Sequence, residues 1–561
     1  MKKLFIILLV SFTLTQCIAI KAESTTSTPI ESSTKTFQSK LQKNPKLIVG
    51  IVVDQMRYDY LIKFYNKYGE GGFKKLMNEG YNLKNVHYNY IPTYTAVGHT
   101  SIYTGTTPVN HGIISNNWYD KYEKKSIYCV DDANYETIGA QTGGKKSPHK
   151  MLTTTVTDQL KLAQNMQGKS IGIAIKDRSA ILPAGHTADA AYWFEGGDEG
   201  KFISSTFYMN ELPNWVNDFN NSGKANGYLN ETWNTYYNIS TYTETLPDNN
   251  KFEGLFEGKT TPTFPYNLAE LRKLNGNYSL LKAVPSGNTI TTDFVEAAIK
   301  GENLGKGNFT DFLAISYSST DYVGHQFGVN AKELEDTYIR LDKDLERLLN
   351  YLDAEVGENN YTIFLTADHA AVQVPSYLNS LKIPGGYFDN DKFEEFVNNI
   401  TLEYFNSKEL IEDISNYQIF LNKEKIKQLN LDIHKVSQTI ADEIISFENV
   451  YKTVTAHTLQ TTSFTSGILE TLQNGYNQKL SGDILFVPNP STISYSKTGS
   501  THGSGYAYDT HVPLIFYGAN IDFGSSNKYY PIIDITPTIS NFLNITEPNG
   551  STGKAILEVL K

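Results

Sequence analysis

The sequence predicts an α/β fold, in which a doubly wound and mostly parallel sheet is flanked by helices and carries inserted cap segments. Three observations lead to this prediction. Short apolar runs recur along the chain, amphipathic helical patterns lie between them, and polar side chains follow the ends of several runs. Strands that alternate with helices are typical of a sheet built from crossover connections.

The apolar runs are the predicted strands. They occupy residues 47–53, 171–175, 312–315, 362–365 and 512–516. Each run is apolar without alternation, which suits a strand buried on both faces, as in a parallel sheet. The clearest helix covers residues 331–352, where leucines and Tyr338 recur at spacings of three and four between charged residues.

Two long stretches interrupt the alternation of strands and helices. Residues 200–285 are rich in Asn, Tyr and Trp, and residues 376–485 have a mixed pattern with helices expected near 406–448. We interpret both stretches as insertions that cap the sheet of one catalytic domain, residues 46–561.

The first 22 residues are expected to be a signal peptide. A short basic start is followed by an apolar run that is too short to span a bilayer comfortably, and then by small residues. Residues 23–45 are rich in Ser, Thr and Lys and predict a flexible lead-in. Cys17 leaves two alternatives open: ordinary signal cleavage, which the poor match of Gln16 favours, or a lipid anchor at Cys17. The chain is therefore expected in the periplasm or at the outer membrane.

The charge of the chain excludes some classes of partner. Removing the first 22 residues takes away three lysines and lowers the formal net charge from −11 to −14. Such an acidic protein binds nucleic acid or anionic membranes poorly, so no nucleic acid is expected as a specific partner. An anionic substrate would need a local positive site, such as metal ions. Only Cys129 remains in the body of the protein, which excludes an internal disulfide. Separately, we expect the protein to be a monomer.

Polar residues at the ends of predicted strands indicate the site. Asp54, Lys176 and Asp368 follow three of the apolar runs closely, and Asp321 lies six residues beyond another. In doubly wound sheets, ligands bind beyond the carboxyl ends of the strands. We therefore expect these four side chains to converge at one edge of the sheet.

A set of Asp and His residues predicts metal binding. Asp321 and His325 are four residues apart, so a helix would present them on one face, and Asp368 and His369 form a second pair. Asp54 and His502, on a glycine-rich loop, complete the set. Each motif alone is more often a surface feature or a helix cap, but together they suit two divalent metals. Two ions about 4 Å apart suit phosphoryl transfer.

A hydroxyl nucleophile is expected in the segment 92–100. Thr93, Thr95 and Thr100 lie where a turn starts a helix, and a helix N-terminus favours an anion. Taken alone, these threonines are more easily explained as cap and turn residues, because a Thr hydroxyl is a weak nucleophile without activation.

The motifs resemble those of the alkaline phosphatase superfamily, in particular the phosphate-irrepressible alkaline phosphatases, which are similar in fold to nucleotide pyrophosphatase/phosphodiesterases. The matching segments are in the family's order and cover nearly all of the mature chain. They are residues 52–57, 92–100, 111–117, 176–178, 319–325, 366–369 and 501–503.

The resemblance implies a role for each matching residue. Thr95 would be the nucleophile, would form a phosphothreonine intermediate and would itself contact a metal. Two Zn²⁺ ions per chain are implied, and their ligands are divided into two groups. One group is Asp54, Asp368 and His369, which would activate Thr95; the other is Asp321, His325 and His502, which would stabilise the leaving oxygen.

Three further residues would bind the phosphoryl group. The resemblance assigns Asn116, Lys176 and Arg178 to its non-bridging oxygens. A lysine and an arginine suit the charge of a monoester, and small-molecule phosphate monoesters of broad scope are the expected substrates. Ala370 departs from the family, which usually has Gly there, and an altered metal affinity or rate is expected. His99, His186 and His511 are expected to be structural.

Two alternative functions stay open. A phosphodiesterase or nucleotide pyrophosphatase could use the same scaffold, with the insertions forming a nucleotide pocket. A catalytically silent, zinc-stabilised binding protein is the other, although no expected ligand or nucleophile is missing.

Overall fold

The computed structural model describes residues 44–561. The predicted signal peptide, most of the predicted lead-in and Cys17 lie outside the described residues. Within residues 44–561, no helix combines the length and the apolar character needed to cross a bilayer.

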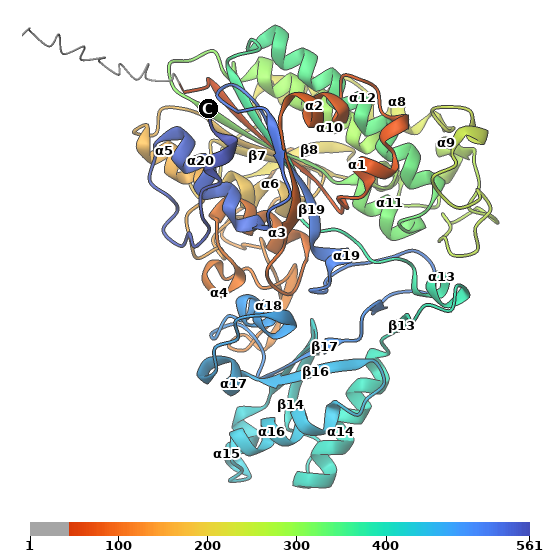
Figure 1. The fold of residues 1–561 in the computed structure, drawn as a ribbon, viewed down its shortest axis with the longest axis vertical. Coiled ribbons are helices and arrows are strands. Elements are labelled where there is room, and N and C mark those ends of the chain that lie inside the picture. The colour runs from red at the N-terminus through yellow and green to blue at the C-terminus, as the bar shows by residue number, and fades with distance from the viewer. Residues whose placement is uncertain (1–43) are drawn as a thin grey trace, which may run out of the picture. The chain divides into compact units, whose positions relative to one another are not determined.

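A large central sheet forms the framework (Figure 1). The strands follow the order β20-β2-β19-β12-β1-β11-β6-β7-β8-β5, and β21 also pairs with β2. Their bounds are β1 (Leu47–Val53), β2 (Tyr81–His87), β5 (Thr137–Ile138), β6 (Ser170–Ala174), β7 (Ala190–Glu195), β8 (Lys201–Ser205), β11 (Asp311–Tyr317), β12 (Tyr361–Thr366), β19 (His511–Gly518), β20 (Gly524–Ser526) and β21 (Tyr530–Pro531).

The five apolar runs of the sequence all form strands of this sheet. The strands β12, β1, β11, β6 and β7 pair in parallel, as expected. By contrast, β19 is antiparallel to both of its neighbours, β12 and β2. A strand that is buried on both faces is a continuous apolar run in either direction, so the pattern predicts the strand but not its direction.

Helices cover the sheet on both faces, which confirms the predicted fold class (Figure 1). One group contains α2 (Phe73–Glu79), α10 (Ser286–Gly301), α11 (Ser319–Phe327) and α12 (Lys332–Glu355). The other contains α3 (Thr95–Thr104), α5 (Val156–Ala163), α6 (Asp177–Ala184) and α20 (Ile535–Leu543). The predicted helix 331–352 corresponds to α12, whose leucines are buried in the main core.

The first predicted insertion, residues 200–285, consists of short elements. After β8 the chain forms α7 (Asn214–Asn221), α8 (Lys224–Leu229) and the two-stranded ribbon of β9 (Thr232–Trp233) and β10 (Tyr266–Asn267). Helix α9 (Leu268–Leu271) and a 3-10 helix, η3 (Asn277–Ala283), complete it. Its aromatic residues, such as Trp233 and Tyr266, pack into the main core rather than forming a core of their own.

The second predicted insertion contains a separate sheet. We call this sheet, together with the helices that accompany it between residues 386 and 493, the cap. Its strands follow the order β14-β15-β17-β16, with bounds β14 (Ile411–Ser415), β15 (Gln418–Leu421), β16 (Val450–Thr455) and β17 (Ile484–Pro488). The helices α14 (Asn390–Phe405), α15 (Lys423–Gln428) and α16 (Ile433–Ile444) accompany them, and a hydrophobic core lies between α14, α16 and the sheet. The helices expected near 406–448 are therefore only partly correct, because β14 and β15 occupy part of that range.

The cap returns to the main domain through a narrow connection. The short strands β13 (Gly386–Tyr387) and β18 (Thr492–Ile493) pair where the chain enters and leaves the cap. On its other side, the cap contacts the main domain through α18 (Gly467–Gly475), whose Thr471 carbonyl accepts a hydrogen bond from the Ile91 amide. The cap thus lies beside the segment that leads into α3.

Candidate active site

The carboxyl ends of the parallel strands bring the predicted ligands together. Asp54 directly follows β1, Asp368 follows β12, and Asp321 lies in the first turn of α11, which follows β11. The expected convergence of Asp54, Lys176, Asp321 and Asp368 is present. The Lys176 ammonium lies 2.7 Å from Asp54 Oδ2 and 2.5 Å from Asp321 Oδ2, and the Gln55 amide donates to Asp368 Oδ1 at 3.1 Å.

Two groups of ligand atoms have the size of metal sites. Asp54, Asp368 and His369 form one group, and their ligand atoms all lie within 4.8 Å of one another. We call this group site A. Site B consists of Asp321, His325 and His502, whose ligand atoms also lie within 4.8 Å of one another. These are the two groups that the resemblance implied.

The three imidazoles are oriented in the same way. Each lies with its Nδ1 close to a backbone carbonyl oxygen: that of Ala370 for His369 (3.0 Å), Ser500 for His325 (2.7 Å) and Thr93 for His502 (2.7 Å). A proton on Nδ1 leaves the Nε2 lone pair for a metal, and such contacts commonly fix the tautomer of a ligating histidine. His325 Nε2 lies 3.1 Å from Asp321 Oδ1, and His369 Nε2 lies 3.5 Å from Asp368 Oδ2.

Burial shapes the charges of site A. Asp54, Asp368 and His369 are fully buried. Burial raises the pKa of Asp54, and the negative charge of Asp368 raises it further. Burial also raises the pKa of Asp368 to about 7 and holds the pKa of His369 well below its usual range. Two acidic groups with raised pKa values and a neutral imidazole favour a cation between them.

Site B has a different balance. Burial acts to raise the pKa of Asp321, but the charges of His325 and Lys176 outweigh it and hold that pKa well below its usual range. Burial lowers the pKa of His502 to about 3, so this imidazole is neutral. Burial acts to lower the pKa of His325, but the charge of Asp321 raises it above its usual value, so His325 would give up a proton on binding a metal. The ionised carboxylate and the two imidazoles are then a donor set that suits zinc.

The donor atoms of site A fit a metal ion. Asp54 Oδ1 and Asp368 Oδ2 are buried and accept no hydrogen bond from any residue in the described part of the chain. Asp54 Oδ2 is close to Lys176 Nζ, as given above, but not in hydrogen-bonding geometry. Because buried polar atoms are rarely left unpaired, these oxygens are available to a bound cation.

Thr95 occupies the first position of α3, as the sequence predicted for a nucleophile at a helix start. Its side chain is 1% exposed. The Thr95 hydroxyl lies 3.4 Å from His369 Nε2 and 3.5 Å from the Lys176 ammonium. It therefore lies beside site A. Thr93 instead donates its hydroxyl to the Ser504 carbonyl, and Thr100 donates to the Ala96 carbonyl, so both act as structural residues.

The three predicted phosphoryl-binding residues differ in their contacts. Lys176 is in direct contact with Thr95, as given above. Asn116 accepts a hydrogen bond from the Ala96 amide, at 2.9 Å, through its side-chain oxygen. Arg178, in the first turn of α6, donates to the Tyr128 hydroxyl at 3.0 Å. Its positive charge acts to lower the pKa of Lys176. Arg178 Nε has no hydrogen-bond partner among residues 44–561, which leaves it available to an anion.

Two contact residues were not predicted from the sequence. Gln55 joins the sites, because its side chain donates to Asp321 at 2.6 Å while its amide donates to Asp368. Tyr128 orients Arg178 and also donates to Asp177. Gln55 lies inside a motif that the sequence singled out, whereas nothing in the sequence around Tyr128 indicated a role.

Ala370 and the three other histidines make mainly backbone contacts. Ala370 is absent from the residues with positive φ, so its backbone does not need a glycine, and its amide donates to the Asp509 carbonyl. His99 is buried under Thr95: its Nδ1 lies 2.9 Å from the Thr95 carbonyl oxygen and its Nε2 lies 3.1 Å from Ser316 Oγ. His186 and His511 lie close to the backbone carbonyl oxygens of Thr153 and Lys84, in keeping with structural roles.

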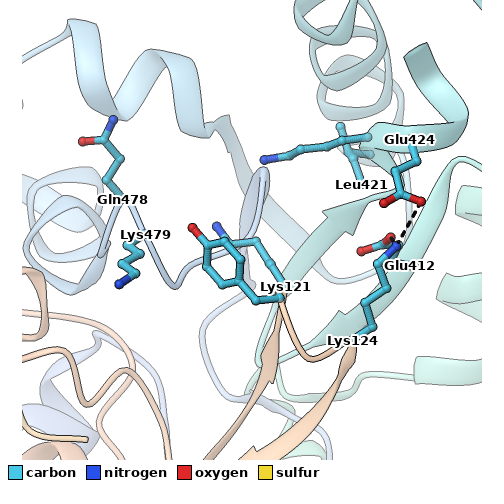
Figure 2. Close-up of a pocket in the computed structure, with 9 residues that line it drawn as sticks. Lys121, Lys124, Glu412, Leu421, Glu424, Gln478 and Lys479 are labelled. Carbon is cyan, nitrogen blue, oxygen red and sulfur yellow. Dashed lines mark ion pairs between the residues drawn. The ribbon is translucent and has the colours of Figure 1, made fainter. Parts of the chain in front are cut away.

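The cap contacts the hairpin that follows Asn116 through ion pairs. This hairpin consists of β3 (Asn117–Asp120) and β4 (Lys125–Tyr128). Figure 2 shows Lys124 at its tip reaching two cap carboxylates, those of Glu412 at 3.2 Å and Glu424 at 3.4 Å, beside a cavity of about 330 Å³. The hairpin therefore links the cap to both Asn116 and Tyr128.

Comparisons with known proteins agree with this fold. Residues 48–512 match the family described as type I phosphodiesterase / nucleotide pyrophosphatase. The chain is 44% identical to alkaline phosphatase PafA of Elizabethkingia meningoseptica over 520 residues, which is 92% of this chain and 94% of that protein. It is also 44% identical to alkaline phosphatase PhoV of Synechococcus elongatus over 518 residues, 92% and 93% of the two chains. A crystal structure of wild-type PafA superimposes with a TM-score of 0.88, at 43% identity, over 92% of this chain and 99% of that one.

Proposed function

We propose that this chain is an alkaline phosphatase that hydrolyses a broad range of phosphate monoesters. The chain belongs to the type I phosphodiesterase / nucleotide pyrophosphatase family, and it is similar over nearly its whole length to alkaline phosphatases. The observation that carries the proposal is the placement of Thr95 beside two groups of metal-binding side chains and the Lys176 ammonium.

Two divalent metal ions fit the residues of this site. Site A and site B each offer carboxylate and imidazole donors, which together favour zinc over magnesium or calcium. When bound, the ions would lower the pKa of an attacking oxygen and stabilise the charge on a leaving oxygen.

The residues of this chain account for the first half of the reaction. Lys176 and Asn116 hold the phosphoryl group against the start of α3, with Arg178 as a planar donor at its outer side. The Thr95 hydroxyl gives up its proton as its oxygen attacks phosphorus. The bond to the alcohol oxygen breaks in line with this attack, and the departing oxygen takes up a proton. Charge on the equatorial oxygens is balanced by fixed donors, which is the main contribution a protein makes to phosphoryl transfer.

A phosphothreonine at position 95 would then be hydrolysed. A water molecule gives up a proton as it attacks the same phosphorus from the side that the alcohol left, and the Thr95 oxygen leaves and takes up a proton. Two in-line displacements retain the configuration at phosphorus. The buried position of Thr95 protects the intermediate from uncontrolled transfer.

Substitution of Thr95 tests the role of the nucleophile. Thr95→Ala is expected to lower kcat by at least about a thousandfold, because the covalent route is lost, while the content of bound zinc stays near two ions per chain. Thr95→Ser keeps a hydroxyl and is expected to retain turnover. Full activity of the alanine variant would show that another group attacks phosphorus.

The substrate class is tested with a matched pair of esters. The specificity constants of zinc-loaded protein for 4-nitrophenyl phosphate and for its methyl diester are measured, with wild type and with the double variant Lys176→Ala/Arg178→Ala. We expect a large preference for the monoester that falls by at least about a hundredfold in the double variant, since two cationic contacts are lost. A preference for the diester, which the family description also includes, would instead identify a phosphodiesterase.

The location of the enzyme is part of the proposal. The signal peptide expected in residues 1–22 predicts export, with the mature chain in the periplasm or held at a membrane through Cys17. Mass spectrometry of the N-terminus of the mature protein decides between cleavage near residue 22 and a lipid-modified Cys17.

A further inference from the structure

A cavity of about 380 Å³ lies between the cap and site B. Tyr94, Thr501 and His502 line it from the main domain, and Tyr417 and Phe486 line it from the cap. We propose that this cavity binds the leaving group of the substrate and selects uncharged leaving groups that carry a planar ring, as in a nucleoside monophosphate. This inference rests on the proposed phosphatase function.

The position of the cavity follows from the direction of attack. The Thr95 hydroxyl lies beside site A, 3.4 Å from His369 Nε2. In-line displacement places the leaving oxygen on the side of phosphorus opposite to Thr95. Site B adjoins site A, because the Lys176 ammonium contacts both Asp54 of site A and Asp321 of site B. Because His502 belongs to site B and also lines the cavity, the leaving group is directed into it.

The lining favours a planar ring. The side chains of Tyr94, Tyr417 and Phe486 offer aromatic surface from two sides of the cavity. The Tyr94 ring packs edge-on against the His502 imidazole, with 5.8 Å between the ring centroids, and Tyr417 packs edge-on against Phe486 at 5.6 Å. Aromatic walls bind planar groups by stacking and by apolar burial.

The lining also disfavours charge on the leaving group. Apart from His502, a ligand residue of site B, the lining residues of the described chain include no acidic or basic side chain. Asn390, Ser494 and Thr501 supply neutral polar groups instead. A carboxylate or ammonium on the leaving group would lose water without gaining an ionic partner, which is costly.

Tyr417 is held in place by its turn. Asn416 and Tyr417 join β14 to β15, and both have left-handed backbones, with φ of 52° and 58°. The Asn416 side chain accepts from the Ser115 hydroxyl at 3.0 Å and donates to the Asn117 carbonyl at 2.8 Å. Two consecutive non-glycine residues in this conformation persist only where surrounding contacts hold them. Those contacts flank Asn116, so the cap ring and the phosphoryl-binding amide are positioned together.

The test compares three phosphate esters of primary alcohols, so that chemical reactivity is similar. Uridine 5′-monophosphate carries the ring, ribose 5-phosphate lacks it, and 3-phosphoglycerate carries a carboxylate. We expect the wild-type specificity constant for uridine 5′-monophosphate to exceed the other two at least tenfold. Tyr417→Ala is expected to lower that constant at least fivefold and to change the constant for ribose 5-phosphate less than twofold, whereas Tyr417→Phe keeps the preference.

Controls separate the possible outcomes. Tyr451→Ala removes an exposed tyrosine of the same cap sheet and is expected to leave all three constants unchanged. If Tyr417→Ala does not fold, Ser494→Lys provides the decision, because an added ammonium in the cavity is expected to raise the constant for 3-phosphoglycerate at least fivefold. Equal constants for the three esters, or equal losses for all three in Tyr417→Ala, would overturn the inference. Hydrolysis of none of them would instead overturn the proposed function.

Discussion

At the scale of single residues, Gln55 shows how the two metal-binding groups are held in register. It follows Asp54 directly and adopts a left-handed backbone, with φ of 66°. This conformation directs its amide to Asp368 of site A and its side chain to Asp321 of site B. Gln55 is therefore a positioning residue for both groups, and it is not expected to contact the substrate.

The prediction for Gln55→Ala is a loss of metal affinity with little loss of chemistry. Outer contacts that orient metal ligands are typically worth about 10- to 100-fold in affinity, and we expect a loss in that range. At saturating zinc, kcat is expected to stay within about threefold of wild type. Zinc titrations of activity measure both quantities, with Gln438→Ala on the exposed face of α16 as the control. A reduced kcat at unchanged zinc affinity would show that Gln55 acts on the substrate instead.

The same residues mark the limit of what the sequence could predict about the site. The Asp and His ligands were predictable because their chemistry is distinctive and because they follow apolar strands. Gln55 and Tyr128 were not, since an amide or a phenol has no preferred role until its neighbours are known. The neighbours of Gln55, Asp321 and Asp368, are 266 and 313 positions away in the chain.

At the scale of elements, the site depends on how closely α3 approaches the loop after β12. Gly98 lies in α3, whose residues are all buried, and a Cβ atom at this position would lie 2.1 Å from the Asp368 carbonyl oxygen. Helix α3 carries Thr95 and the loop carries two ligands of site A. The absence of a side chain at position 98 therefore sets the distance between nucleophile and metal site.

Gly98→Ala is expected to separate these two elements. Because the clash is with backbone, the helix or the loop must shift, and we expect a loss of at least about 2 kcal/mol in the free energy of unfolding and of about 100-fold in kcat/KM. Urea unfolding and steady-state kinetics measure the two effects. Gly227→Ala in α8 is the matched control, since nothing lies within 4 Å of its added Cβ, and it is expected to be neutral or slightly stabilising. Wild-type kinetics in Gly98→Ala would show that this approach is not required.

Elements also differ in how well the sequence predicted them. The central strands and α12 were predictable because each is long, buried and strongly patterned. The cap strand β14 was not, since its residues are only half-buried and its length is five residues. Such a strand depends on pairing with β15 and on contacts with the β3–β4 hairpin, and neither leaves a strong local pattern.

At the scale of the whole molecule, buried acidic groups make stability depend on pH. Glu335 in α12 is fully buried and accepts a hydrogen bond from the Thr245 hydroxyl. Burial raises its pKa from 4.5 to about 7. Below pH 4.5 the Glu335 carboxyl is protonated in both the folded and the unfolded state, so it does not lower the free energy of unfolding. As the pH rises to 7, the unfolded chain loses this proton first, so stability falls and the full cost is present above pH 7.

Glu335→Gln is therefore expected to stabilise the protein only at higher pH. We expect the free energy of unfolding to rise by about 1–2 kcal/mol at pH 8.5 and to change by less than about 0.5 kcal/mol at pH 4.5, because the amide keeps the shape without the charge. Urea unfolding of the zinc-loaded protein at the two pH values measures this difference, with the exposed Glu394→Gln as the control. An equal gain at both pH values would show that charge is not the cause.

Metal binding at sites A and B is expected to join several parts of the molecule. Asp54 follows β1, Asp321 starts α11, Asp368 follows β12, and His502 precedes β19, so the two sites together tie the central strands to one another. Ligands that bind only the folded state add about 4 kcal/mol per site at a thousandfold excess over Kd. Removal of zinc by a chelator is therefore expected to lower Tm by on the order of 10 °C, and added zinc is expected to restore it. Calorimetry of the stripped and reloaded protein measures this shift, and His502→Ala, which leaves site A intact, is expected to show about half of it. An unchanged Tm in protein shown to contain no metal would mean that Lys176 and the buried hydrogen bonds alone hold these carboxylates together, and that the ions act only in catalysis.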